Sequence, residues 1–298
     1  MLIVHRKLSV FATSVLHYSI PEYGFEGKDF PGISITGGHC ELKCKHCFAT
    51  ILRRMKWAET PMKLIKLGEE LAHRGVKGIL ISGGSNHKGE VEFERFSSAI
   101  RKLKDLGLKI FMHTGIVDDK RARMLRDIGI DMVLYEIPTS NGVIREIFNL
   151  RNRTIGDYYK GLMSLIEHKV PVAPHLVVGL DRNIDNEINM INTVSNIGCN
   201  AFVMVIFTPL SGTPLEKASP PSIDRVLTVM SYARRKIHAP LSLGCMRPRS
   251  EPYRIVERKA VDLEFDGIAF PSLEALDYAK TKRELRFFNE CCAAIAFY

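Results

Sequence analysis

The sequence of 298 residues has no long apolar run. No stretch approaches the ~20 apolar residues that a membrane-spanning helix needs. The first residues, MLIVHRKLSV, lack the apolar core and the small-residue cleavage site of a signal peptide. We therefore expect a cytoplasmic protein that does not bind membranes.

Cysteine is also scarce, and its placement is uneven. Seven cysteines are too few and too irregularly spaced for a disulfide scaffold, yet three of them fall between residues 40 and 47. In a reducing compartment, such a group is typical of metal ligands.

Charge is not concentrated in any one part of the chain. The 42 Lys and Arg outnumber the 33 Asp and Glu, which gives a net charge of +9. No basic run is interleaved with aromatic residues, so nucleic-acid binding is not expected. The excess is compatible with a solvated basic surface, and equally with attraction of an acidic protein or an anionic ligand.

Short runs rich in β-branched residues alternate with longer runs that have helical spacing of apolar positions. This alternation favours parallel strands joined by crossover helices, and eight such units can close into a TIM barrel. A doubly wound open sheet is the alternative. The expected strands are 33–38, 78–84, 109–115, 132–138, 172–179, 201–207, 240–246 and 267–271. The expected helices are 61–74, 92–105, 119–128, 156–168, 184–196, 222–236, 252–263 and 273–286.

No low-complexity linker marks a boundary between two domains. We expect residues 1–32 to form an N-terminal extension over one end of the barrel. Residues 33–286 would form the barrel domain, and residues 287–298 a C-terminal tail with a cysteine pair that folds over the barrel mouth.

The segment GGHCELKCKHCFAT places Cys40, Cys44 and Cys47 after the first expected strand. In a TIM barrel, the carboxyl ends of the strands carry the chemistry. Structural zinc and ordinary iron-sulfur clusters take four protein ligands, whereas three thiolates leave one metal position open. The alternative is a zinc knuckle that His39 or His46 completes.

This CxxxCxxC spacing, with His46 directly before Cys47, resembles the signature of the radical S-adenosylmethionine (SAM) superfamily. The resemblance implies a [4Fe-4S] cluster held by Cys40, Cys44 and Cys47, whose fourth iron binds SAM through its amino and carboxylate groups. One-electron reduction then cleaves SAM to the 5'-deoxyadenosyl radical, which takes a hydrogen atom from the substrate.

Polar and glycine residues follow several later strands, and the same resemblance implies that they bind SAM. Ser82, Gly83 and Gly84 match the glycine-rich motif that receives the SAM amino group, although Ser85 stands where the superfamily often has glutamate. Arg145, Arg151 or Arg153 would hold the SAM carboxylate, because guanidinium suits bidentate binding. The full set of expected cofactor-binding residues is His46, Ser82, Gly83, Gly84, His113, Glu136, Arg153, His175, Val177 and Phe207.

Three of the later cysteines suggest a second metal site. Cys245 ends the seventh expected strand in LGCMRPRS, and Cys291 and Cys292 lie in the C-terminal FFNECCAAIAFY. If the tail folds back, these three thiolates could ligate a second iron-sulfur cluster, aided by Arg247 and Arg249. Alternatively, the adjacent pair only packs the last helix. Cys199 is expected to be a small buried residue.

Nearly the whole chain resembles biotin-synthase-related radical SAM proteins, through KDFPGISITGGHCELKCKHC, FTPLSGTPLEK and GCMRPR. Within that group it most resembles subunits of two-component lipoyl synthases, although it lacks the CxxxxCxxxxxC motif of the single-chain enzyme. That resemblance implies sulfur insertion into an octanoyl chain, with an octanoylated lipoyl carrier protein, a second homologous radical SAM subunit and an electron donor such as ferredoxin as partners.

Two other functions remain open at this point. The first is a single-cluster, biotin-synthase-like enzyme that acts as a mutase, a methylase or a carbon-carbon bond enzyme. The second is a non-catalytic metal-binding partner protein whose first cysteine motif holds zinc.

Overall fold

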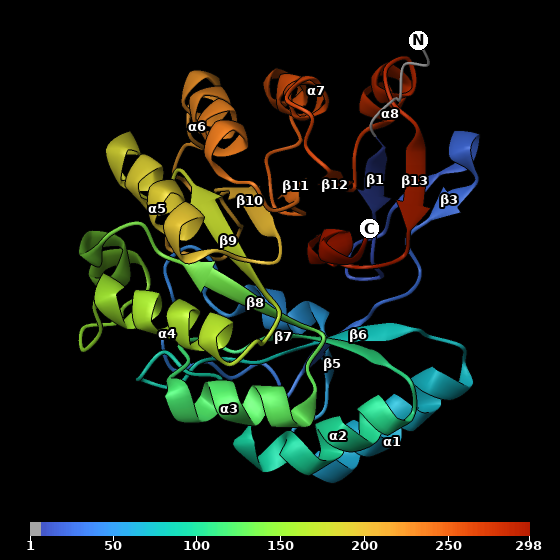
Figure 1. Cartoon of the computed structure of the whole chain (residues 1–298), viewed down its shortest axis with the longest axis vertical. Coiled ribbons are helices and arrows are strands. Elements are labelled where there is room, and N and C mark those ends of the chain that lie inside the picture. The colour runs from blue at the N-terminus through green and yellow to red at the C-terminus, as the bar shows by residue number, and fades with distance from the viewer. Residues whose placement is uncertain (1–6) are drawn as a thin grey trace.

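The computed structural model describes residues 7–298, which form one curved sheet of 11 strands (Figure 1). The strand order is β13-β1-β12-β11-β10-β9-β8-β7-β6-β4-β5, and every pairing in this sheet is parallel. The strands are β1 (Leu8–Phe11), β4 (Gly32–Ser34), β5 (Lys56–Trp57), β6 (Gly78–Ser82), β7 (Lys109–His113), β8 (Met132–Ile137), β9 (Val172–Val178), β10 (Phe202–Ile206), β11 (Leu241–Leu243), β12 (Gly267–Ala269) and β13 (Leu285–Phe288).

Crossover helices connect successive strands and lie around the outside of the curved sheet (Figure 1). They are α1 (Pro61–His73), α2 (Ser97–Asp105), α3 (Asp119–Ile128), α4 (Ile155–Glu167), α5 (Ile184–Ile197), α6 (Ile223–Lys236), α7 (Arg254–Asp262) and α8 (Leu273–Lys280). Shorter elements are the antiparallel pair β2 (Ser19–Ile20) and β3 (Phe25–Glu26), the 3-10 helices η1 (Pro21–Tyr23), η2 (Thr50–Arg54), η3 (Glu94–Phe96), η5 (Glu251–Tyr253) and η6 (Cys292–Phe297), and the π-helical η4 (Val143–Ile147). No helix among the described residues is long and apolar enough to cross a membrane.

The helices begin and end where local chemistry favours it. Thr154 and Asp157 form a capping box that satisfies free backbone N–H groups at the start of α4. Asp118 caps α3 by accepting a hydrogen bond from the Arg121 N–H, and Gly129 ends that helix at φ 81°. These signals are local, which is why helix positions follow closely from the sequence.

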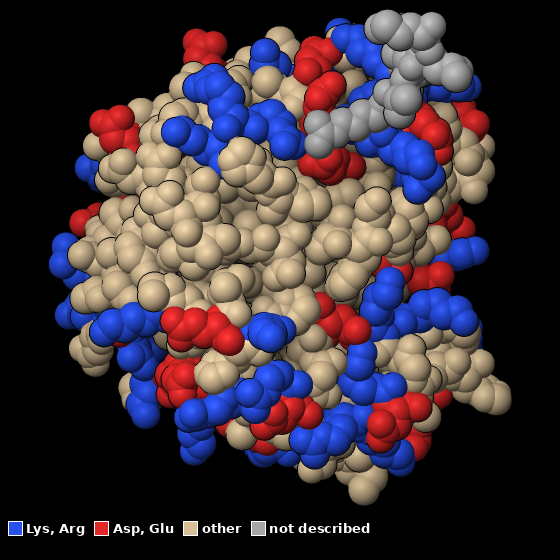
Figure 2. All heavy atoms as spheres, in the orientation of Figure 1, with Lys and Arg blue, Asp and Glu red and all other residues tan. Residues whose placement is uncertain are grey.

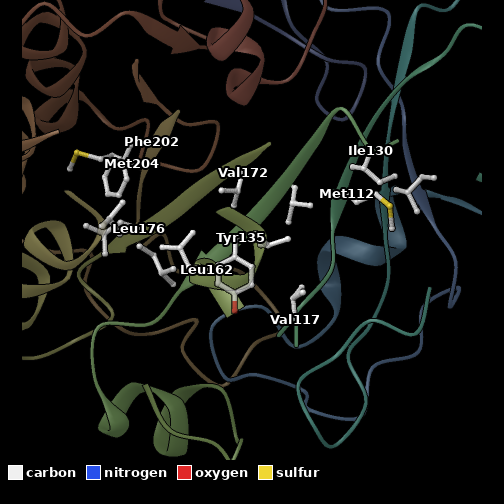
Figure 3. Packing of buried hydrophobic residues seen from close by; sticks show 14 of the residues in the cluster. Met112, Val117, Ile130, Tyr135, Leu162, Val172, Leu176, Phe202 and Met204 are labelled. Carbon is white, nitrogen blue, oxygen red and sulfur yellow. The ribbon is translucent and has the colours of Figure 1, made fainter. Parts of the chain in front are cut away.

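The outer face of the sheet and the helices share one apolar core. Figure 3 shows Tyr135, Val172 and Leu176 of the strands beside Leu162 of α4. All four are almost fully buried. Burial of such side chains contributes roughly 1.5–3 kcal/mol each before entropy is counted, and this packing fixes the position of the carboxyl ends of β7 to β10.

The inner face of the sheet packs against a second apolar cluster. Because side chains alternate along a strand, Phe111, Leu134 and Val203 point inward, where the C-terminal η6 contacts β8, β10, β11 and β12. Ala293 and Ala294 of η6 are fully buried there. The C-terminal tail therefore fills the interior of the sheet.

Charged side chains do not form a single-sign patch on the face seen in Figure 2. Blue and red residues are intermixed there, around a broad band of uncharged residues over the region of β8, β9, β10 and η6. The net positive charge is not gathered on this face.

The expected fold class is confirmed: each of the eight predicted strands occurs, and parallel strands alternate with helices. The barrel is partial, however, because no pairing among the described residues joins β5 to β13 and closes it. The short strands β4 and β5 end the sheet on one side, and the tail occupies the interior. A doubly wound sheet is wrong, since the crossover helices α1 to α8 lie on the outer face only.

Two segments at the ends of the chain differ from the predicted elements. The last helix was expected to reach residue 286, but α8 ends at Lys280 and Leu285–Phe288 forms β13, because this segment pairs with β1. Residues Leu8–Phe11, expected in the N-terminal extension, form β1 between β12 and β13. Residues 1–6 of that extension lie outside the described residues.

Candidate active site

The loop after β4 carries the three clustered cysteines. Its backbone turns sharply, with the Cys47 and Phe48 N–H groups both donating to the Cys44 carbonyl, and Phe48 and Ala49 adopting positive φ. Cys40, Cys44 and Cys47 are free and partly exposed. The loop therefore presents its thiols at the carboxyl edge of the sheet.

The segment after η4 holds this loop in place. The Asn149 side-chain amide donates to the carbonyls of Leu42 (3.0 Å) and Lys43 (2.9 Å). The Lys45 N–H donates to the Ile147 carbonyl at 2.7 Å, and the Cys44 thiol lies 3.4 Å from the Phe148 carbonyl. The cysteine loop is thus bound by chain that follows β8.

The glycine turn after β6 holds the loop from the other side. Thr36 Oγ1 accepts a hydrogen bond from the Gly84 N–H (2.7 Å) and donates to the His39 carbonyl (3.0 Å). A Cβ on Gly84 would lie 1.9 Å from that His39 oxygen and 2.5 Å from the Cys40 Cα. Only glycine permits this approach of the two backbones.

His46 points from the loop toward Glu136 of β8, with 3.8 Å between His46 Nε2 and Glu136 Oε1. Its Nδ1 atom is buried and has no hydrogen-bond partner among the described residues. Burial opposes protonation of His46, but the Cys47 thiolate and Glu136 outweigh it and raise the pKa. Desolvation raises the pKa of Glu136, although 41% of its side chain is exposed.

The thiols of the loop influence one another. The Cys44 thiol, followed by His46, stabilises the Cys47 thiolate and lowers the pKa of Cys47 to about 4. The same contact with Cys47, together with burial, raises the pKa of Cys44. One thiolate is therefore already favoured in the loop, as metal binding requires. Among the described residues, no three His, Cys, Asp or Glu side chains are yet arranged as a finished metal cage.

A small pocket lies beside the loop. Glu136 and Val177, both expected to bind the cofactor, line it together with Phe148, whose ring lies 5.3 Å from that of His46. The remaining lining residues come from the end of β8, the chain that follows it through η4, and the loop after β9: Ile137, Pro138, Thr139, Val143 and Leu180. The pocket combines an apolar wall with one carboxylate, which suits a ligand with an apolar face and a hydroxyl.

His113 and His175 face each other on the inner side of β7 and β9, with ring centroids 5.8 Å apart. Burial lowers the pKa of His113 to about 4 and that of His175 to about 3. Both rings are therefore neutral at pH 7. His175 Nδ1 lies 2.9 Å from the Ala173 carbonyl, so Nδ1 carries the proton and Nε2 is left as an acceptor.

The other expected cofactor residues lie near the same edge. Ser82 is buried, and its carbonyl accepts the Ile35 N–H. Phe207 is buried after β10. Arg153 donates to Glu90 Oε1 at 2.9 Å and to the Lys88 carbonyl, so its guanidinium already has partners. Arg145 and Arg151 are exposed.

The structure brings Cys245, Cys291 and Cys292 together. Both Cys291 and Cys292 interact electrostatically with Cys245, although within the described part of the chain these three thiols are not arranged as a metal cage. The hydrogen bond from Cys292 lowers the pKa of Cys291, and that of Cys292 is raised. Cys245 follows β11, whose carboxyl end lies at the same edge as that of β4, because the strands are parallel.

Two arginines lie beside Cys245 and help to lower its pKa. Burial raises the pKa of Cys245 and outweighs Arg247 and Arg249. Arg247 is itself buried and donates to Glu257 and to the carbonyls of Gly244, Ala269 and Phe270. Arg247 therefore serves mainly to hold the end of β11.

Several supporting residues were missed from the sequence. Thr36 and Asn149 bind the cysteine loop, and Glu257 binds Arg247. Glu187 of α5 is fully buried and accepts the Gly179 N–H at 2.6 Å, which holds the turn after β9. Apart from the local Thr36–His39 hydrogen bond, these contacts join residues that are far apart or lie on helices, so spacing gave no signal for them.

The chain is similar to known proteins over more than half of its length. Residues 34–194 match a family model described as the radical SAM superfamily. A biotin synthase of Vesicomyosocius okutanii is 22% identical over 209 residues, which cover 68% of this chain and 64% of the relative. The mitochondrial biotin synthase of Saccharomyces cerevisiae is 26% identical over 217 residues, covering 68% and 57%. The chain thus spans less than two thirds of these relatives' length.

Solved structures share the fold. Methylornithine synthase (PylB) has a TM-score of 0.57 at 15% identity, with 84% of this chain and 74% of that chain covered. Streptococcus suis SuiB bound to S-adenosylmethionine has a TM-score of 0.58 at 14% identity, with 78% and 54% covered. The curved parallel sheet is the feature common to all three.

Proposed function

The chain belongs to the radical SAM superfamily, and on this premise we propose that it inserts sulfur at unactivated C–H positions of its substrate. At the coarser level it is a radical SAM enzyme similar to biotin synthases, a family that uses a [4Fe-4S] cluster and SAM. The observation that carries the finer proposal is the meeting of Cys245, Cys291 and Cys292 at the edge of the sheet that also bears the first cysteine motif.

The residues of the first loop fit the family's cofactors. Cys40, Cys44 and Cys47 would supply three thiolates, which is the ligand set for a cluster with one open iron. The backbone of Gly84 packs directly against His39 and Cys40, so the glycine turn would lie beside a small ligand held at the cysteine loop. When bound, the cluster and SAM supply the one-electron chemistry that removes a hydrogen atom from the substrate.

The chain's own contribution is binding, orientation and exclusion of water. Glu136 would accept a hydrogen bond from a ligand hydroxyl, while Val177 and Phe148 pack against its apolar face. His113 and His175, both neutral, present polar groups to the interior without adding charge. The apolar inner cluster keeps water away from the reacting carbon.

The three later thiolates would ligate a second cluster, which is the proposed source of sulfur. Iron and acid-labile sulfide per chain test this after anaerobic reconstitution of the wild type, C40A/C44A/C47A and C245A/C291A/C292A. We expect two clusters in the wild type and one in each variant. The second variant should still cleave SAM under dithionite but form no sulfur-containing product.

Cys199→Ala provides the matched control, because burial raises the pKa of Cys199 to about 12 and keeps it a protonated thiol. This variant should retain both clusters. If C40A/C44A/C47A keeps no iron, the second cluster is absent and the enzyme is a single-cluster, biotin-synthase-like mutase, methylase or carbon-carbon bond enzyme. The similarity to biotin synthases favours this second candidate.

For the substrate, we propose an octanoyl chain on a lipoyl carrier protein, as in two-component lipoyl synthases. The apolar side chains Phe148 and Val177 that line the pocket beside Glu136 suit contact with an alkyl chain, and the net charge of +9 favours an acidic carrier domain. Incubation with an octanoylated carrier domain and a second homologous radical SAM subunit should add two sulfur atoms to the acyl chain, detectable by mass spectrometry. An unchanged acyl mass with active SAM cleavage would exclude this substrate.

A further inference from the structure

Segment 42–58, which contains part of the cysteine loop, η2 and β5, carries cations and no carboxylate. Its five basic residues are Lys43, Lys45, Arg53, Arg54 and Lys56. Lys43 and Lys45 flank Cys44. The other three basic residues lie at the end of η2 and in β5. The segment therefore places a run of one charge sign beside the first cysteines.

Within residues 7–298, none of these five side chains takes part in an ion pair. The carboxylates at the two borders of the segment are engaged elsewhere: Glu41 binds His87, and Glu59 binds Lys63. Many cations in the rest of the chain have acidic partners, for example Lys104 with Asp131 and Arg123 with Asp119. The five like charges therefore repel one another and lack a compensating partner within the described residues.

The same segment exposes two aromatic side chains. Phe48, directly after Cys47, is 37% exposed, and Trp57 of the edge strand β5 is 51% exposed. The Trp57 ring is held by a hydrogen bond from its Nε1 to the Leu52 carbonyl at 3.0 Å. Fixed aromatic residues together with arginines are the side chains most enriched in protein interfaces. The segment thus offers apolar anchors together with its charge.

We propose that segment 42–58 is the docking surface for an acidic, low-potential electron carrier of the ferredoxin type. This inference rests on the proposed function, which needs one electron per SAM cleaved. The reduced carrier loses one electron and the iron-sulfur site at Cys40, Cys44 and Cys47 gains it, so no further reactant is required. Cys44 and Cys47 belong to segment 42–58 itself and Cys40 precedes it in the same loop, so a carrier docked there would lie beside the site that takes the electron.

The test uses the reconstituted full chain and compares two reductants. Arg53→Glu/Arg54→Glu reverses two exposed charges of the surface. Arg101→Glu/Lys120→Glu reverses two exposed charges on α2 and α3 and is the matched control. Each protein is assayed for 5'-deoxyadenosine with dithionite and with an acidic [4Fe-4S] ferredoxin, and ferredoxin affinity is measured by calorimetry without SAM.

We expect Arg53→Glu/Arg54→Glu to lower ferredoxin-driven turnover and affinity by about tenfold or more at low salt, since steering of this kind changes association by 10- to 1,000-fold. The dithionite rate should stay at the wild-type level, and rising salt should weaken ferredoxin binding to the wild type. Equal ferredoxin affinity in all three proteins would overturn the inference. If Arg53→Glu/Arg54→Glu loses affinity only for an acidic lipoyl carrier domain and binds ferredoxin normally, the surface binds the substrate carrier and the inference is overturned. No cleavage with dithionite by the wild type would instead refute the proposed function.

Discussion

Gly84 shows how one residue controls the geometry of the cysteine loop. Its missing side chain lets the turn after β6 approach the backbone of His39 and Cys40, and Thr36 fixes that approach through two hydrogen bonds. The Gly-Gly pair is visible in the sequence, but the partner that excludes a Cβ is not. The sequence thus indicates a special position without saying what it touches.

Gly84→Ala should therefore displace the loop and reduce iron bound after reconstitution, with a loss of about 1–3 kcal/mol in unfolding free energy from overpacking. Iron content and urea unfolding measure the two effects. Gly142→Ala is the control, because a Cβ there meets only Ser140 Oγ at 3.4 Å. Normal iron binding by Gly84→Ala would show that the close approach is not needed.

The two inward histidines predict a pH dependence of stability. Their pKa values in the folded chain are about 4 for His113 and about 3 for His175, below the ~6.5 of an unfolded histidine. Below pH 6.5 the unfolded chain binds more protons than the folded chain. The contribution of the two neutral rings to the unfolding free energy is therefore fully present above that pH and is lost as the pH falls toward 4.

We expect the unfolding free energy of the wild type to fall by roughly 1–3 kcal/mol more between pH 7 and 4.5 than that of His113→Gln/His175→Gln. Urea unfolding at both pH values measures the difference. His238→Gln, which changes an exposed ring, should behave as the wild type does. Parallel curves for all three proteins would mean that the inner rings are not held neutral.

At the scale of elements, the buried pair Arg247–Glu257 joins the end of β11 to α7 and to the segment after β12. Glu257 accepts from Arg247 and also from the N–H and hydroxyl of Ser272, the N-cap of α8. The surroundings lower the pKa of Glu257, chiefly through Arg247, even though burial opposes this. The pair thereby positions the loop that carries Cys245.

Removing this carboxylate leaves a buried guanidinium without its counter-charge, so Glu257→Gln should cost about 3–5 kcal/mol of unfolding free energy. Glu274→Gln breaks exposed pairs with Arg254 and Arg258 and should cost less than about 1 kcal/mol. Denaturant unfolding compares the two. Equal small losses would show that the buried pair does not organise this part of the fold.

Elements with strong local signals were predictable, and elements made by distant pairing were not. The β-branched runs and the helical spacing of apolar positions located the central strands and helices within a few residues. By contrast, LSVF and LRFF are too short to identify as strands. They form β1 and β13 because they pair with each other, and β1 also pairs with β12. The likeness of the cysteine spacing to a known family indicated the first site, whereas Asn149 and Glu257 act through tertiary contacts.

At the scale of the whole molecule, the partial barrel collects both cysteine groups at one edge and fills its interior with its own C-terminus. A closed barrel was expected because periodicity counts strands but does not reveal whether the outer ones meet. The tail supplies Cys291 and Cys292 to the edge where Cys245 lies. The chain end thus belongs to the inner core, and the convergence of the late cysteines depends on it.

The central claim is that Cys40, Cys44 and Cys47 support reductive cleavage of SAM. The most direct measurement is 5'-deoxyadenosine formed under dithionite by the anaerobically reconstituted wild type and by Cys40→Ala, Cys44→Ala and Cys47→Ala. The wild type should form 5'-deoxyadenosine steadily, and none of the three variants should form it above background. Undiminished formation by a variant, or its absence from a wild type that holds iron and sulfide, would contradict it.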